Sequence, residues 1–204
     1  MGTHDTHELS AKGERRRNQI LDAALGLFGD VGYGGTSLRD VATRAGITHP
    51  GLLYHFRSKE HLLQEVLERR EAREIDRVGV GAETDAVVRL QSLMELVEFN
   101  QTTRVEVQLF ATLSSEATDA SHPAHAFFLD RYQRAVAGHR AMFANLRERG
   151  LLRPGVEPDD AARLLVALMD GLQVQWLYDP TVPMARLVRE VTDAWCVRPI
   201  ADLV

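Results

Sequence analysis

The sequence predicts an all-α protein in which a small N-terminal helix-turn-helix head of three helices precedes a larger C-terminal helical bundle. Two observations support this fold class. Apolar residues recur with helical spacing in nearly every segment, and no segment alternates apolar and polar residues as a half-buried strand does. At 204 residues the chain is also long enough to bury a core without disulfides or metal ions.

The first predicted element is an amphipathic helix from about Glu14 to Val31. One face of this helix is apolar and consists of Ile20, Ala23, Ala24, Leu27, Phe28 and Val31. The glycine-rich segment "GDVGYGGTS" is expected to end it. Residues 1–11 are polar, and we expect them to form a disordered tail.

Two short helices follow, on either side of a glycine. Ser37 and Asp40 match a capping box for the first helix, and Gly46 can take the left-handed conformation that closes it. Thr48 is placed to cap the second helix, with Pro50 in its first turn. A sharp bend between two brief helices is typical of the helix-turn-helix motif, whose second helix enters the major groove of DNA. The predicted small core of this unit is Leu38, Val41, Ile47, Leu52 and Phe56.

The remainder of the chain also reads as helical. Proline and glycine mark the ends of most segments, as they do in loops and first helical turns. Helices are predicted after Ser58 and over Glu83–Phe99, Thr103–Ala117, Pro123–Arg149, Pro158–Tyr178 and Pro183–Val197.

The charge is unevenly distributed. The chain has a net charge of −5, yet the segment from Lys12 to Arg73 holds 11 basic and 8 acidic residues. A positive N-terminal third beside an acidic remainder suits a phosphate-contacting module attached to a larger body, although a fluctuation on a solvated surface explains so small a difference equally well. We expect no membrane span and no export signal, and the single Cys196 favours the reducing cytoplasm.

Catalytic and metal sites find little support in the sequence. There is no glycine-rich phosphate loop and no nucleophile elbow. His122 and His125 are three residues apart, but no carboxylate or thiolate completes a metal site with them. Asp159 and Asp160 begin a helix, where the helix dipole explains them. We therefore predict a protein that is not an enzyme and that has neither a metal site nor a cofactor.

The segment "TSLRDVATRAGITHPGLLYHFRSKEHLL" resembles the DNA-binding signature of the TetR family of bacterial transcriptional repressors. The resemblance runs from about Gln19 to Val66. It implies a DNA-binding domain over residues 12–58 and a domain for ligand binding and dimerisation over residues 59–204. It further implies a cytoplasmic homodimer that binds double-stranded operator DNA and leaves it when a small-molecule effector binds.

Candidate DNA contacts lie on the two short helices and at their ends. The candidates for phosphate contact are Thr36, Ser37, Thr48, Tyr54, His55 and Lys59, and the candidates for base-edge contact are His49, Pro50 and Gly51, with Arg44 as a further candidate. The chain departs from the family pattern at two positions. It has Leu53 where members usually have Tyr, and Gly51 where they often have Thr, Ala or Asn. The operator sequence therefore does not transfer from relatives.

The C-terminal region supplies candidates for a pocket and a dimer interface, although the same helical stripes would serve an internal core equally well. The pocket candidates are Phe99, Phe110, Met142, Phe143, Gln173 and Trp176. The dimer candidates are Phe128, Tyr132, His139, Leu146, Leu165 and Leu172.

We predict a DNA-binding transcriptional regulator that acts as a repressor and is released by a small molecule. The alternative is an all-α ligand-binding protein or enzyme whose helical hairpin does not bind DNA. Convergent ionisable groups in the pocket would favour that alternative.

Overall fold

The computed structural model describes residues 3–78 and 85–203, with side chains described over 12–75 and 85–203. Within these ranges the chain is helical and lacks β-strands apart from one isolated bridge, which confirms the predicted all-α fold. The helices are α1 (Thr3–Gly35), α2 (Leu38–Arg44), α3 (His49–His55), α4 (Lys59–Val78), α5 (Ala86–Asn100), α6 (Arg104–Glu116), α7 (His125–Glu148), α8 (Pro158–Tyr178) and α9 (Met184–Trp195), with a final 3-10 turn over Ile200–Asp202.

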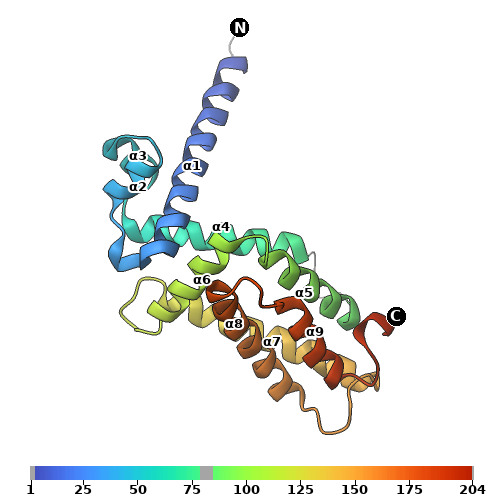
Figure 1. The fold of residues 1–204 in the computed structure, drawn as a ribbon. Coiled ribbons are helices and arrows are strands. Elements are labelled where there is room, and N and C mark those ends of the chain that lie inside the picture. Colours follow the sequence, from blue (N-terminus) through green and yellow to red (C-terminus); the bar gives the residue numbers. More distant parts are fainter. Residues whose placement is uncertain (1–2, 79–84, 204) are drawn as a thin grey trace.

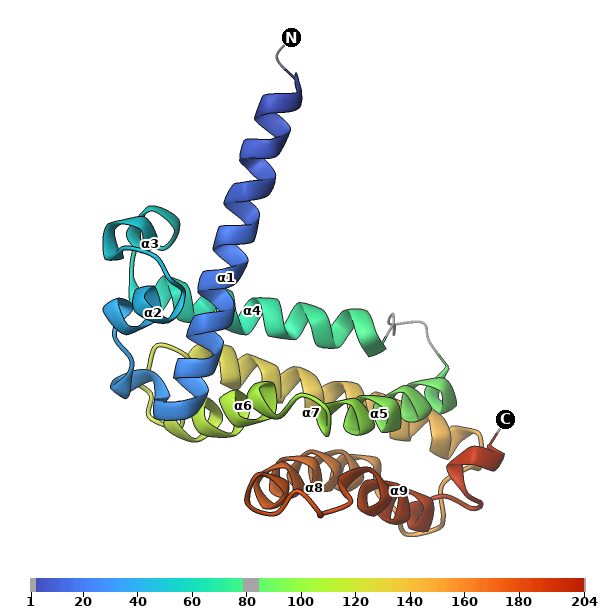
Figure 2. The same cartoon turned by 45° about the horizontal axis from the view of Figure 1, so that its top comes forward.

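Figures 1 and 2 show a head and a layered body. We call residues 12–67 the head and residues 68–203 the body. In the head, α2 and α3 lie on one side of α1, which extends well beyond them (Figure 1). In the body, α4 lies above the layer of α5, α6 and α7, and α8 and α9 form the opposite layer (Figure 2).

The start of α1 differs from the prediction. The helix begins at Thr3 rather than near Glu14, so residues 3–11, which we expected to be disordered, are helical. Starting a helix is unfavourable, but extending an existing helix gains one backbone hydrogen bond for each residue that is fixed. A polar segment can therefore continue a helix that is already formed. The apolar face from Ile20 to Phe28, which is packed in the head core, anchors that existing helix.

The core of the head joins all four of its helices to the body. Val41, Leu52 and Phe56 are buried as predicted, and Leu38 and Ile47 pack against them as partly buried side chains. The same cluster continues into α4, α6 and the start of α7 through Leu62, Leu63, Val66, Leu67, Leu109, Phe110, Leu113, Ala117, Ala124 and Phe128. The head is therefore fixed to one end of the body by shared hydrophobic packing.

A second cluster forms the core of the body and corrects part of the predicted dimer interface. Leu146 and Leu165 are 0% exposed and Leu172 is 5% exposed in a single subunit, while Phe128 is 3% exposed in the head cluster. Side chains buried this deeply cannot contact a second subunit. Their helical stripes face inward because α7 and α8 pack against each other, α7 also packs against α5, and α8 also packs against α6 and α9.

The C-terminal end closes the body. Cys196 is free and buried, and the backbone N–H of Val197 donates to the carbonyl oxygen of Leu151 at 3.0 Å. Burial and the nearby Asp193 raise the pKa of the Cys196 thiol to about 11, so this thiol is protonated at neutral pH. Among the described residues, no helix combines the length and the apolar character needed to cross a bilayer.

A glycine joins the two units. At Gly32 the backbone has φ of 72° and ψ of 178°, which interrupts α1 one turn before its end. This region of conformational space is essentially open to glycine alone. A Cβ atom at this position would also lie 2.0 Å from the Oε1 atom of Glu116 on α6. The sharp turn of α1 against α6 therefore requires a residue without a side chain.

We predict that Gly32→Ala destabilises the protein by about 1 to 3 kcal/mol, because alanine strains this backbone conformation and displaces Glu116. Urea unfolding followed by circular dichroism measures the loss. Gly34→Ala is the matched control, since a Cβ atom there meets nothing within 4 Å. Equal stability of the two variants would contradict the assigned role of Gly32.

Candidate nucleic-acid interface

The turn between α2 and α3 has the geometry of a helix-turn-helix. The N–H of Asp40 donates to the Ser37 hydroxyl at 3.2 Å, and the N–H of Ser37 donates to the Asp40 carboxylate at 3.1 Å, so the predicted capping box is present. Gly46 adopts φ of 64°, and the N–H of Ile47 donates to the carbonyl oxygen of Ala42 at 2.9 Å. These bonds close α2 and set the direction in which α3 leaves.

The start of α3 is capped as the sequence predicts. The Thr48 hydroxyl accepts a hydrogen bond from the N–H of Gly51 at 3.2 Å, and Pro50 occupies the first turn. Leu52 points inward and is 0% exposed, which leaves the opposite face of α3 free. Thr48 and Pro50 are exposed, and His49 and Gly51 are partly exposed. The predicted base-reading edge therefore faces solvent.

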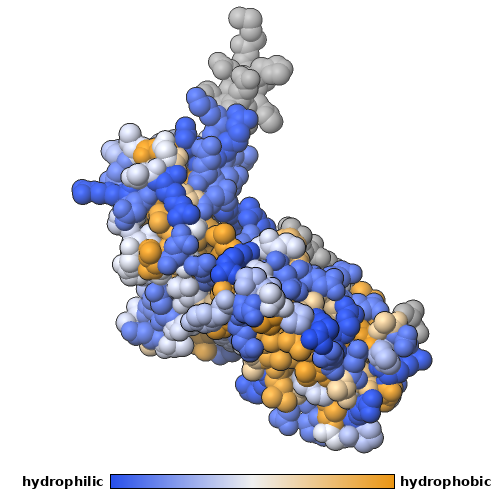
Figure 3. Space-filling model, in the orientation of Figure 1, coloured by the Kyte–Doolittle hydropathy of each residue, from blue (hydrophilic) through white to orange (hydrophobic). Residues whose placement is uncertain are grey.

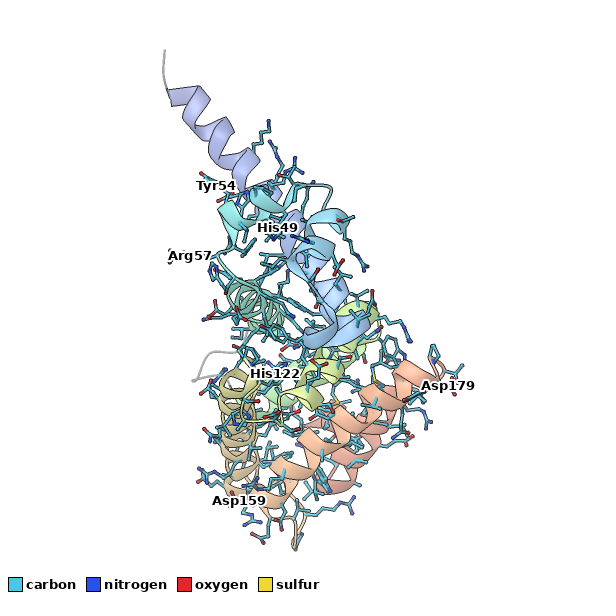
Figure 4. All side chains as sticks on the ribbon, turned by 90° about the vertical axis from the view of Figure 1, so that its left-hand side faces the viewer. His49, Tyr54, Arg57, His122, Asp159 and Asp179 are labelled. Carbon is cyan, nitrogen blue, oxygen red and sulfur yellow. The ribbon has the colours of Figure 1, made fainter. Side chains whose placement is uncertain are left out.

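A shallow groove lies along this edge. It is lined by Arg16, Thr43, Gly46, Ile47, Thr48, Gly51, Tyr54 and His55. Tyr54 is 87% exposed, and its ring packs edge-on against the ring of His55, with 5.3 Å between the ring centres. Figure 4 shows His49, Tyr54 and Arg57 on the head, at the opposite end of the molecule from Asp159. Donor groups and an aromatic side chain thus converge on one open surface, which suits a phosphate backbone.

Two residues of the groove, Arg16 and Thr43, are not among those predicted from the sequence. Arg16 belongs to the basic run "KGERRR", whose charge was visible, but only the packing of α1 in the head places its side chain next to α3. The exposed end of α2 places Thr43 there too. Both residues line the same groove as the predicted contacts Thr48, Gly51, Tyr54 and His55.

Thr36 is the predicted DNA contact that the structure contradicts. It is 3% exposed, and its hydroxyl donates to the carbonyl oxygen of Gly32 at 2.8 Å. Because the bend at Gly32 presents that carbonyl oxygen to the hydroxyl, Thr36 stabilises the end of α1 and does not reach a phosphate.

Two predicted cations are engaged with the protein. The Arg44 guanidinium pairs with Asp30 at 3.0 Å and packs against α1. The Lys59 ammonium lies 4.1 Å from the centre of the Tyr33 ring, and the Tyr33 hydroxyl donates to Glu60 at 2.7 Å. These contacts hold both side chains near the head surface and restrict the positions in which either could bind a phosphate.

A cavity of about 240 Å³ lies in the body between α4, α5, α6, α7 and α8. Two of the predicted pocket residues, Phe110 and Gln173, line it, as do two of the predicted dimer residues, Tyr132 and His139. The structure places the other pocket candidates elsewhere. Met142, Phe143 and Trp176 belong to the body core, and Phe99 is not part of the cavity wall. Helical periodicity could not separate these positions, because core and cavity residues share the same stripes.

One end of the cavity holds a buried ion-pair network. Arg70 pairs with Glu74 at 2.6 Å, and Glu74 also pairs with Arg131 at 2.7 Å. Both guanidinium groups lie over the Phe110 ring, at 4.7 Å and 5.0 Å from its centre. Burial lowers the pKa of Arg70 while Glu74 opposes the shift, and an arginine remains charged nonetheless.

The neighbouring wall carries a second polar pair. The Tyr132 hydroxyl donates to the Asp170 carboxylate at 2.8 Å. Burial raises the pKa of Asp170 against the opposing effect of that hydrogen bond, and burial is also the main reason that the pKa of Tyr132 rises to about 12. Burial, with a smaller contribution from Arg89, lowers the pKa of His139 to about 4, so its imidazole is neutral at neutral pH.

The cavity therefore does present ionisable groups, the feature that we set as the mark of an enzyme. Most of them are engaged with one another as ion pairs or hydrogen bonds. No group of three His, Cys, Asp or Glu side chains within the described part of the chain is arranged to hold a metal ion. His122 instead meets Tyr33 at 5.2 Å between ring centres.

An exposed helix-turn-helix joined to a helical body with an internal cavity defines a class of DNA-binding transcriptional regulators. The comparisons with known proteins agree and identify the family. Residues 20–66 match the family model described as bacterial regulatory proteins, tetR family, and residues 89–200 match that of the BetI-type transcriptional repressor, C-terminal. The chain belongs to the TetR family of bacterial regulatory proteins.

Individual relatives are similar over most of the chain. The regulator PksA of Bacillus subtilis is 29% identical over 82% of this chain and 81% of its own. The repressor KstR2 of Rhodococcus jostii is 34% identical over 61% of this chain and 54% of its own. The crystal structure of NalD, the secondary repressor of the MexAB-OprM multidrug efflux pump in Pseudomonas aeruginosa, matches with a TM-score of 0.67 and 30% identity over 91% of this chain and 98% of its own. These relatives confirm the predicted class and disfavour the enzyme alternative.

In the native protein, hydrogen bonds from the Ser37 hydroxyl and backbone N–H lower the pKa of Asp40. We predict that Ser37→Ala raises this pKa, because it removes the hydroxyl. In the native protein the folded-state pKa lies below the unfolded value of about 3.9, so the stabilisation is present above that pH and is lost as pH falls through the folded-state pKa. A carboxyl NMR titration measures the shift. The lowered pKa of Asp119, which depends on Ser121, is the internal control and should stay unchanged. An unmoved Asp40 would show that the capping box is absent in solution.

Proposed function

We propose that this protein is a repressor that binds operator DNA as a homodimer and is released when a small molecule occupies the cavity of the body. The observation that carries the proposal is the exposed edge of α3, with Arg16 and Tyr54 beside it. A dimer would hold two such edges about 34 to 36 Å apart, and they would enter successive major grooves on the same side of the DNA.

The residues of the groove and of the adjoining first turn of α3 divide into two roles. His49, Pro50 and Gly51 lie in the first turn of α3 and would meet base edges, where a small or donor-bearing side chain permits close approach. Arg16, Thr48, Tyr54 and His55 flank this turn and would contact phosphates. Phosphate contacts set affinity and base contacts set sequence preference.

A dimer surface is available on the outer face of the body. Along α8, Leu164, Ala167, Gly171, Val174 and Tyr178 are exposed and are spaced so that they share one side of the helix. Leu164, Val174 and Tyr178 are 56%, 44% and 89% exposed, and Leu129 of α7 is 51% exposed. Figure 3 shows hydrophobic side chains gathered on the body in the region of α8. Two copies of α7 and α8 would form a four-helix interface that covers this surface.

The connection between cavity and head runs through α6. Phe110 of α6 lines the cavity, while Gln108 and Thr112 of the same helix both donate to the carbonyl oxygen of Gly29 on α1 at 3.2 Å. Glu116, at the end of α6, accepts the N–H of Tyr33 at 2.9 Å. A ligand that displaces Phe110 therefore moves the helix that holds the end of α1, and the spacing of the two heads changes.

We predict that Arg16→Ala weakens binding to operator and to unrelated DNA alike. Each lost phosphate contact should reduce the slope of log affinity against log salt by about 0.9. Fluorescence anisotropy at several salt concentrations measures both effects. Arg186→Ala is the control, because Arg186 is exposed on α9, where it pairs with Glu190 at 2.6 Å. Unchanged DNA affinity of the Arg16→Ala protein would show that the groove is not part of the DNA interface.

His49→Ala is expected to behave differently, because its side chain lies at the edge assigned to base reading. It should alter the preferred sequence, with a loss of about 1 to 3 kcal/mol at the affected base pair and little change in the salt slope. Selection from a random DNA library, compared with the same selection by the native protein, measures the preference. An identical selected sequence would show that His49 does not read bases.

We predict that Leu164→Glu converts the dimer to a monomer and weakens operator binding by at least about tenfold, because it places an unpaired charge in the proposed interface. Sedimentation velocity measures the oligomeric state. Val88→Glu is the control, since Val88 is 47% exposed on α5 and is not part of the surface assigned to the interface. A Leu164→Glu protein that remains dimeric would place the interface elsewhere.

A further inference from the structure

The chemistry of the cavity defines the class of effector, an inference that rests on the proposed function. Most charges at the cavity are neutralised within the protein. Arg70 and Arg131 share Glu74, and Arg134 pairs with Glu71 at 2.8 Å and with Asp130 at 2.7 Å. A ligand that approached these groups would have to compete with existing ion pairs.

Arg89 is the exception. It lies on α5 and lines the cavity, and within residues 12–75 and 85–203, where side chains are described, it pairs with no carboxylate. Its guanidinium lies against α7 at Gly138, where a Cβ atom would be 3.4 Å from Nη2. The guanidinium therefore lies close to the backbone of this turn of α7, at the cavity wall. An unpaired arginine beside a cavity is a ready binding site for an anion.

His139 adds a second donor beside Arg89. It follows Gly138 on α7, lines the same cavity, and is close enough to Arg89 that the positive charge disfavours its protonation. A neutral imidazole carries one N–H, and over the described residues this ring makes no hydrogen bond. An anion held by Arg89 would therefore find a further donor within the same wall.

The rest of the cavity wall is largely apolar. Leu93 and Leu96 lie on α5 at four and seven residues beyond Arg89, and therefore on the same face of the helix. Val166 and Met169 of α8 line the cavity as well. This arrangement places an apolar surface directly beyond the free guanidinium.

Two residues of the cavity wall carry buried polar atoms that have no hydrogen-bond partner within the part of the chain that the structure describes. Gln173 is 7% exposed and Arg70 is 4% exposed, and both line the cavity. The Oε1 atom of Gln173 and the Nε atom of Arg70 are buried without a hydrogen-bond partner.

We propose that the effector is an amphipathic organic monoanion, such as a medium-chain carboxylate. Its anionic head binds Arg89 and His139, and its apolar body lies along Leu93, Leu96 and Met169. The bidentate fork of arginine matches the geometry of a carboxylate.

A cationic effector fits the same cavity less well. The carboxylate that would receive it, Asp170, already accepts the Tyr132 hydroxyl at 2.8 Å and lies in the field of Arg131 and Arg70. A cation placed beside Asp170 would meet two guanidinium groups. The charge arrangement therefore favours an anion at Arg89.

Calorimetric titration of the full-length protein with three probes of equal chain length tests the proposal. The probes are octanoate, 1-octanol and octyltrimethylammonium, each below its micelle concentration. Octanoate should bind more tightly than the other two. Arg89→Gln should weaken octanoate binding by at least about tenfold and leave octanol binding unchanged, because only the carboxylate loses its charged partner. Arg89→Lys should lie between the native protein and Arg89→Gln, because it keeps the charge and loses the fork.

Arg186→Gln is the matched control and should bind octanoate as the native protein does, since Arg186 lies outside the cavity wall. Failure of octanoate to bind, tighter binding of octyltrimethylammonium, or native affinity for octanoate in a folded Arg89→Gln protein would each overturn the proposal. DNA binding by the same preparations is measured in the absence of probe, with operator DNA selected from the genome. If the protein binds DNA but any of those failures occurs, only the proposed effector class is wrong. If the native protein does not bind DNA, the proposed function itself is wrong.

Discussion

The attachment of α6 to the end of α1 is the constraint on which the arrangement of the molecule depends. One carbonyl oxygen, that of Gly29, accepts hydrogen bonds from Gln108 and Thr112, and one carboxylate, that of Glu116, fills the space that a side chain at position 32 would occupy. Shared apolar packing along α6 and the start of α7 reinforces these bonds. Because α1 also packs against α2, and α2 packs against α3, the direction of the reading edge follows from this junction.

The cavity is built from the elements that hold the head. α4 contributes Leu62 and Leu63 to the head core and, two turns further on, Arg70 and Glu74 to the cavity wall. α6 contributes Phe110 to the cavity and its opposite side to the junction. Under the proposed function, a molecule in the cavity would act on both supports of the head at once. The difference in its affinity for two head orientations would set how far their populations shift.

The predicted helices agree with the structure where local signals are strong. α8 spans Pro158–Tyr178, as predicted from a proline start and an aspartate–proline end, and the caps at Ser37 and Thr48 form as their spacing requires. Predictions that depended on which face a helix presents were less successful. Leu146 and Leu165 are core residues, Tyr132 and His139 line the cavity, and Thr36 is buried. Arg16 was missed because its neighbour in space, α3, is more than 30 residues away in sequence.

The sequence alone determined the all-α class, the helix-turn-helix with its caps, and the family resemblance, because capping, glycine turns and apolar periodicity act between residues a few positions apart. Only the tertiary structure decided which stripe faces the core, the cavity or solvent, which arginines are paired, and that Arg89 has no carboxylate partner among the side chains that the structure describes. Those properties depend on how helices distant in sequence pack together. The apolar stripe of one helix can be buried against any of several neighbouring helices, so its spacing alone does not identify the partner.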